Sequence, residues 1–169
     1  AATPVEVFAL RGGYRKGSSR EYNPLTNSWR EDAPPMEYDG LEVALVKFSN
    51  GALGKVSVNA DCIMPYRFPL RIFGNKGSVF DNRLWSHQFP GQKQWEELPG
   101  ICPDSSDVRH HPFQGEMDHF VECIQGNRES HCNLEDAVKT HEVVFAALRS
   151  YETGRPVRLP GNLDREFVL

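Results

Sequence analysis

The chain of 169 residues is poor in cysteine, and the spacing of its cysteines excludes the common cysteine-based structures. Cys62, Cys102, Cys123 and Cys132 form no CxxC pair. A structural zinc site usually uses such pairs, and a disulfide framework needs a denser set. We therefore expect free thiols in a reducing compartment and predict a cytoplasmic protein.

Clustered positive charge and long apolar runs are also lacking. Lys and Arg number 19 against 23 Asp and Glu, for a formal net charge of −4. Nucleic acids and anionic membranes bind to clustered basic residues, so neither is expected as a partner. No apolar run approaches the ~20 residues that a membrane span needs. The first ten residues, AATPVEVFAL, contain no basic leader, so we expect no signal peptide.

The familiar catalytic and cofactor motifs GxGxxG, GxSxG and HExxH are absent. Gly74-Asn75-Lys76-Gly77 leads from one predicted strand into another, whereas a phosphate loop leads into a helix, so we interpret it as a β-turn. The adjacent His110 and His111 lack carboxylates at ligand spacing, so we predict no metal site. Residues 21–29 resemble one kelch propeller blade, but no further blade follows at the required period of ~50 residues.

What the first half does contain is a series of strand patterns. Residues 52–61 alternate strictly, with Val56 and Val58 on one face and Asn59 and Asp61 on the other, so one face should be covered and the other should meet water or a partner. Asn50-Gly51 predicts a tight hairpin turn. Residues 14–40 and 90–112 read as irregular stretches. The predicted strands are 4–10, 41–48, 52–61, 67–73, 78–80 and 84–89.

The second half predicts two helices followed by a short edge strand at 156–160. The first helix ends near Gly126, where we expect a left-handed residue. The second begins after Asn133 as N-cap and stops at Gly154. We expect each helix to bury one apolar stripe against the sheet. The stripe residues are Met117, Phe120, Val121 and Ile124 in the first helix and Leu134, Ala137, Val138, His141, Val144, Phe145 and Leu148 in the second.

This order, with strands first and helices second, lacks βαβ alternation. It predicts an α+β fold, with a mostly antiparallel or mixed open-faced β-sheet and helices packed on one face. The length predicts a single domain over residues 1–169.

Three stretches resemble the C-terminal domain of the Gfo/Idh/MocA oxidoreductases, the family of glucose–fructose oxidoreductase and inositol dehydrogenase. They are the hairpin YDGLEVALVKFSNGALG at 38–54, the turn IFGNKGSV at 72–79, and the helical region FQGEMDHFVECIQG at 113–126 with LEDA at 134–137 and SYETGRPVRLP at 150–160. The resemblance covers nearly the whole chain. It implies a fold like the C-terminal domains of dihydrodipicolinate reductase and glyceraldehyde-3-phosphate dehydrogenase.

The same resemblance implies an NAD- or NADP-dependent oxidoreductase of sugars or polyols, with the cofactor held by a Rossmann domain that this sequence lacks. The chain alone should then bind no cofactor, carry no catalytic residue and be inactive by itself. The resemblance also implies a homodimer formed through the sheet. For the substrate-binding wall, the candidates are Asn59, Asp61, Arg71, His110 and His111. The alternative is a non-catalytic binding or scaffold protein that dimerises through its open sheet face.

Overall fold

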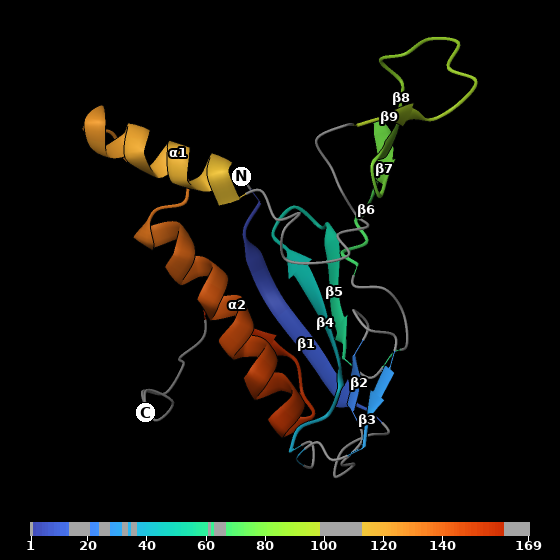
Figure 1. The fold of residues 1–169 in the computed structure, drawn as a ribbon, viewed down its shortest axis with the longest axis vertical. Helices are drawn as coiled ribbons and strands as arrows, with labels where there is room; N and C mark the ends of the chain where they lie inside the picture. Colours follow the sequence, from blue (N-terminus) through green and yellow to red (C-terminus); the bar gives the residue numbers. More distant parts are fainter. Residues whose placement is uncertain are drawn as a thin grey trace. The chain divides into compact units, whose positions relative to one another are not determined.

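The computed structural model describes residues 2–13, 21–23, 28–31, 34, 37–60, 62, 67–98 and 113–160 (Figure 1). The chain forms two compact units. Unit 1 comprises Ala1–Glu21, Trp29–Cys62 and Asp118–Leu169, and unit 2 comprises Tyr22–Ser28 and Ile63–Met117. Antiparallel sheets together with two helices confirm the predicted α+β class.

A four-stranded antiparallel sheet in the order β10-β1-β4-β5 forms the centre of unit 1. The strands are β1 (Pro4–Gly12), β4 (Leu41–Phe48), β5 (Leu53–Asn59) and β10 (Val157–Arg158). Strand β10 lies at one edge, as predicted from its flanking prolines. Strand β5 ends at Asn59, two residues earlier than predicted, because Ala60 is already in a turn.

The turn between β4 and β5 is wider than the Asn50-Gly51 pair alone indicates. Only Gly51 of this pair has a positive φ, at 86°. The amide of Gly51 donates to the carbonyl of Phe48 at 2.9 Å, and the amide of Ala52 donates to the Asn50 side chain at 3.1 Å. The glycine supplies the left-handed residue, while the asparagine stabilises the loop through its side chain.

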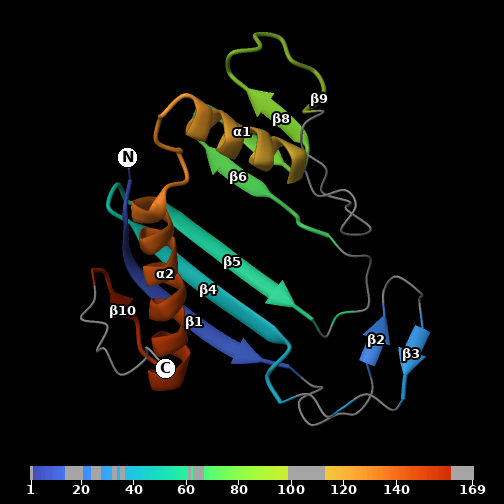
Figure 2. The ribbon, with the colours of Figure 1, turned by 60° about the vertical axis from the view of Figure 1, so that its left-hand side comes forward.

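Helix α2 (Leu134–Thr153) covers one face of this sheet, but not with the stripe predicted from the sequence (Figure 2). Ala146 is fully buried against Val7 and Val46, and Val143 and Ala147 pack beside it. The predicted stripe is largely wrong, since Leu134 is 80% exposed and Val138, Val144 and Phe145 are also exposed. His141 is likewise exposed and its ring nitrogen contacts the carbonyl of Ala137. Small side chains form the contact because they let the helix backbone approach the strands closely.

The buried hydroxyl of Ser150 joins α2 to the edge of the sheet. It accepts the amide of Ala9 at 2.9 Å and donates to the carbonyl of Arg155 at 2.7 Å. Strand β10 pairs with Glu6 and Val7 and does not reach Ala9. The serine therefore supplies the acceptor that a longer edge strand would have supplied to the Ala9 amide.

The ends of the helices follow capping rules, with one correction. Asn133 accepts the Asp136 amide at 2.9 Å as N-cap of α2, and Gly154 ends that helix in the left-handed region, as predicted. After α1 (Phe113–Gln125) the left-handed residue is Asn127, with φ 44°, and not Gly126. Asparagine tolerates this conformation better than most side chains, so the chain needs no glycine there.

The apolar stripe of α1 remains exposed. Met117, Phe120, Val121 and Ile124 are all exposed, and among the described residues no strand or helix packs extensively against them. The expectation that both helices lie on the sheet is thus met by α2 only. The described part of the chain contains no helix that is long and apolar enough to cross a membrane.

Unit 2 is built on a second antiparallel sheet in the order β6-β7-β8-β9. Its strands are β6 (Arg71–Gly74), β7 (Gly77–Phe80), β8 (Arg83–Ser86) and β9 (Glu96–Glu97). Gly74–Gly77 closes the β6–β7 turn, as predicted. Strand β9 lies in a stretch predicted to be irregular, as do β2 (Glu21–Asn23) and β3 (Ser28–Arg30), which pair with each other. Strands of two or three residues are too short to show periodicity.

Candidate functional site

Asn59 lies at the end of β5, on the sheet face opposite α2. Its register partner on β4 is Leu41, and its side chain is exposed. Lys55 and Ser57 share this face, so β5 presents polar groups there, as predicted. Leucines are exposed on the same face, namely Leu10 on β1, Leu45 on β4 and Leu53 on β5. The open face therefore combines exposed apolar side chains with the polar groups of β5.

The other face of β5 differs from the prediction. Val56 and Val58 were expected to be covered, but they are 67% and 59% exposed. Helix α2 contacts β1 and β10 and lies over the β1–β4 pair, which leaves β5 beyond its reach.

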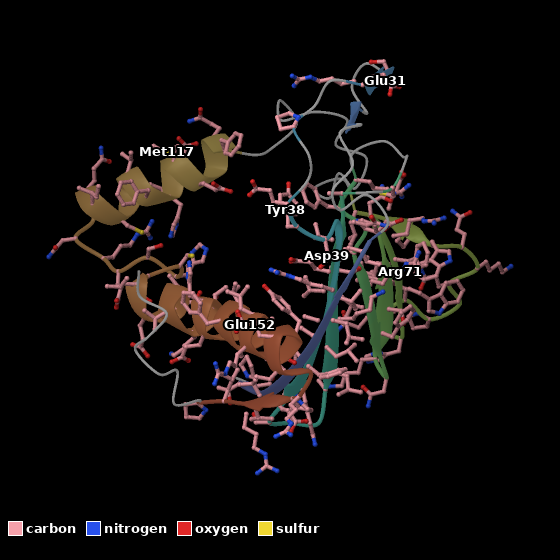
Figure 3. The ribbon with its side chains drawn as sticks, turned by 90° about the horizontal axis from the view of Figure 1, so that it is seen from below. Glu31, Tyr38, Asp39, Arg71, Met117 and Glu152 are labelled. Carbon is pink, nitrogen blue, oxygen red and sulfur yellow. The ribbon has the colours of Figure 1, made fainter. Side chains whose placement is uncertain are left out.

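Two residues near Asn59 were missed by the sequence reasoning. Tyr38 and Asp39 precede β4, at the same end of the sheet as Asn59, and Figure 3 shows both beside the start of that strand. The amide of Ala60 donates to the carbonyl of Gly40 at 2.7 Å, which ties the two segments together. The hairpin register could have found them, because pairing of Leu41 with Asn59 brings the residues just outside each strand together.

Arg71 begins β6 in unit 2. It pairs in register with Phe80 on β7, and its guanidinium lies 4.5 Å from the centroid of the Phe80 ring. The side chain is exposed, and Figure 3 labels its position. Asn59 and Arg71 belong to different units. The remaining candidates, Asp61, His110 and His111, lie outside the described residues.

A second group of polar side chains links α1 to the turn before α2. The His119 ring lies 4.2 Å from that of His131, and its Nε2 is 3.1 Å from the Ser130 hydroxyl and 3.5 Å from Sγ of Cys123. His119 is half-buried, so it is held by these contacts. Among the described residues no three His, Cys, Asp or Glu side chains are placed to hold a metal ion.

Tyr151 on α2 is held beneath a charged pair. The guanidinium of Arg11 lies 3.5 Å from the centroid of its ring and forms an ion pair with Glu42 at 2.8 Å. The Tyr151 hydroxyl is buried with no hydrogen-bond partner in the described part of the chain. Burial raises the pKa of this hydroxyl above its usual value, since the phenolate would be desolvated, and the nearby Arg11 opposes that shift.

Tyr151→Phe is therefore expected to keep or raise stability, because a buried hydroxyl without a partner costs about 1 kcal/mol or more. A raised pKa stabilises the fold below the ordinary tyrosine pKa of about 10, and this contribution is lost as the pH rises through the folded-state value. The free energy of unfolding measured in urea should therefore be higher for the Phe variant than for the wild type, and this difference should grow as the pH rises above about 10. Tyr38→Phe, at an exposed tyrosine, is the control and should leave the free energy of unfolding unchanged at every pH. A clearly destabilised Tyr151→Phe would show that the hydroxyl has a partner.

The described residues do not fit a nicotinamide dinucleotide. A dinucleotide cradle places a glycine-rich turn between a strand and a helix N-terminus, where the amides meet the pyrophosphate. The glycine-rich turn at Gly74–Gly77 joins two antiparallel strands instead. Helix α2 follows α1 through a turn capped by Asn133 rather than following a strand. No step of hydride transfer can be assigned to these residues.

The chain matches a known family and several solved structures. The family described as "Oxidoreductase family, C-terminal alpha/beta domain" matches residues 5–159. Scyllo-inositol 2-dehydrogenase (NAD(+)) of Bacillus subtilis (strain 168) is 29% identical over 127 residues, covering 73% of this chain and 36% of that protein.

Two solved structures show the same fold. An oxidoreductase domain protein from Kribbella flavida has a TM-score of 0.68 at 19% identity, covering 94% of this chain and 46% of its own. A levoglucosan dehydrogenase in complex with NADH and levoglucosan has a TM-score of 0.66 at 15% identity, covering 94% and 45%. The chain spans less than half the length of each of these relatives.

Proposed function

Because the chain belongs to the Gfo/Idh/MocA oxidoreductase family, whose C-terminal alpha/beta domain matches residues 5–159, we propose that it is the substrate-binding and oligomerising domain of an NAD(P)-dependent sugar or polyol oxidoreductase. One observation carries this proposal. The match is to a domain of an oxidoreductase, yet the described residues do not fit the cofactor. The proposal therefore assigns NAD or NADP to another domain, and this chain alone is inactive.

The substrate wall is proposed at the polar candidates Asn59, Asp61, Arg71, His110 and His111. A polyol offers many hydroxyl groups, and a site that binds it needs several donors and acceptors around one ligand. The exposed side-chain amide of Asn59 offers both a hydrogen-bond donor and an acceptor. Inositol oxidation is the activity named for the Bacillus relative, which makes inositols the first substrates to try.

The open sheet face is proposed as the homodimer interface. Leu10, Leu45 and Leu53 are exposed there, with Leu53 82% exposed. Contiguous exposed apolar side chains on a sheet are typical of an interaction surface. A two-fold dimer would bury the same patch from both subunits.

Turnover tests the proposed activity. The full-length protein should reduce NAD⁺ or NADP⁺ with at least one member of a panel of inositols, aldoses and sugar acids, and the 169-residue chain should reduce neither. Asn59→Ala in the full-length protein should raise KM about tenfold, the effect of losing one or two hydrogen bonds to substrate. Ser57→Ala, two residues earlier on the same face, is the control. Turnover by the 169-residue chain alone would refute the proposal.

A further inference from the structure

Two arginines flank one phenylalanine on a single face of the β6-β7-β8 sheet. Arg71 and Arg83 are both register partners of Phe80, one on each side. Their guanidinium carbons lie 4.5 and 5.6 Å from the Phe80 ring centroid. The two charges are thus no farther apart than the sum of these distances, and the ring holds both side chains in place.

Neither of these guanidinium groups forms an ion pair within the described part of the chain. The third arginine nearby, Arg67, is paired with the buried Asp81 at 2.8 Å. Glu97 is the register partner of Arg83 on β9, but no ion pair within 4.0 Å joins them, and its carboxylate lies 3.5 Å from the Asn82 amide nitrogen. Two like charges held beside one ring repel each other, and an anion between them would relieve that repulsion.

Aromatic rings continue the same face beyond the arginines. Trp85 follows Arg83 by two residues and so shares its side of β8. Trp95 lies 6.0 Å from the Trp85 ring and 6.5 Å from the Phe80 ring. Both tryptophans are partly exposed, at 41% and 39%. Flat rings with accessible faces offer a stacking surface next to the two guanidiniums.

We propose that this face binds an anionic sugar, with Arg71 and Arg83 holding its phosphate or carboxylate and the Trp85–Trp95 rings stacking on its C–H face. Guanidinium groups match such anions with two parallel hydrogen bonds, which the aromatic contact leaves available. The inference rests on the proposed function in that Arg71 belongs to both, and it adds the chemical class of the ligand. It commits to a charged ligand, whereas the family match alone does not.

Binding to the full-length protein, measured by calorimetry at low salt, tests the inference. D-glucose 6-phosphate should bind, D-glucose should bind at least tenfold more weakly, and inorganic phosphate should also bind more weakly because it lacks the sugar ring. Arg71→Gln and Arg83→Gln should each weaken D-glucose 6-phosphate binding about tenfold, the effect of a lost charge-assisted contact. Arg158→Gln, at an arginine whose side chain is 89% exposed, is the matched control.

The inference is overturned if the Arg71→Gln/Arg83→Gln double variant binds D-glucose 6-phosphate as the wild type does. It is equally overturned if inorganic phosphate binds as tightly, because the rings would then contribute nothing, or if the double variant changes the oligomeric state, because a second copy would then occupy the face. Turnover of a neutral polyol without sugar phosphate binding would refute this inference and leave the proposed function intact. Sugar phosphate binding without any turnover would refute the proposed function and leave this inference intact.

Discussion

Leu45→Glu is expected to dissociate the proposed homodimer, with a dissociation constant raised about 100-fold or more. Leu45 is exposed at the middle of β4, on the face opposite α2, with Phe8 as its register partner on β1. A carboxylate placed there would lose its hydration in the interface, which costs several kcal/mol, and its cross-strand neighbour Lys55 would offset only part of that cost. Two-fold symmetry brings the charge in twice, once from each subunit. Sedimentation velocity across a concentration series measures the shift.

Val56→Glu is the matched control for this experiment. It introduces the same charge into the same sheet, but Val56 shares its face with Ala44 on the side of α2. The control should leave the dimer intact. A dimer that tolerates Leu45→Glu and falls apart with Val56→Glu would place the interface on the other face.

Ser150→Ala is expected to lower the free energy of unfolding by about 2–4 kcal/mol. The change leaves two backbone groups, the amide of Ala9 and the carbonyl of Arg155, without the hydroxyl that satisfies them. A buried unsatisfied group of this kind costs about 1–3 kcal/mol. The site is fully buried, so no water can take the place of the hydroxyl without moving the helix. Urea unfolding followed by circular dichroism measures the loss.

Thr153→Ala removes a hydroxyl from the next turn of α2. That hydroxyl is exposed, and its partners among the described residues are carbonyls of its own helix, of which the Arg149 contact is the shorter at 2.8 Å. Its loss should change stability by less than about 0.5 kcal/mol. Equal effects of the two substitutions would mean that the Ser150 bridge does not join helix and sheet.

The fold class and the main strands could be predicted because both depend on local patterns. Alternation and turn residues located β1, β4 and β5, and caps located the ends of α2. The family resemblance, which rested on the order of such motifs, was confirmed by the match over residues 5–159.

The buried face of α2 could not be predicted from hydrophobicity. The sequence favours Leu134, Val138 and Phe145, whereas the structure buries Ala146 and Ser150. Hydropathy ranks large apolar residues first, but close packing of a helix on a sheet favours small side chains. Ser150 is buried because its hydroxyl accepts a hydrogen bond from the Ala9 amide, 141 residues away in the sequence. Such a choice depends on tertiary contacts that no local window contains.

The candidate site was predicted only in part. Period-two alternation placed Asn59 on the open face, and the presence of a charge in an apolar strand singled out Arg71. Arg83, which lies on the other side of Phe80, was not predicted. The sequence pattern does not show which residues of β7 and β8 pair across the turn at Asp81 and Asn82. Cross-strand neighbours become visible only when the register of each hairpin is fixed.

The mass of the native protein tests the central claim most directly. An immunoblot against this domain, in cells that express the protein, should give a band near 40 kDa, about two typical domains. That result would agree with a chain that spans less than half of its relatives and with a cofactor held by a separate domain. A single band at 19.2 kDa would contradict the account and favour a stand-alone binding or scaffold protein.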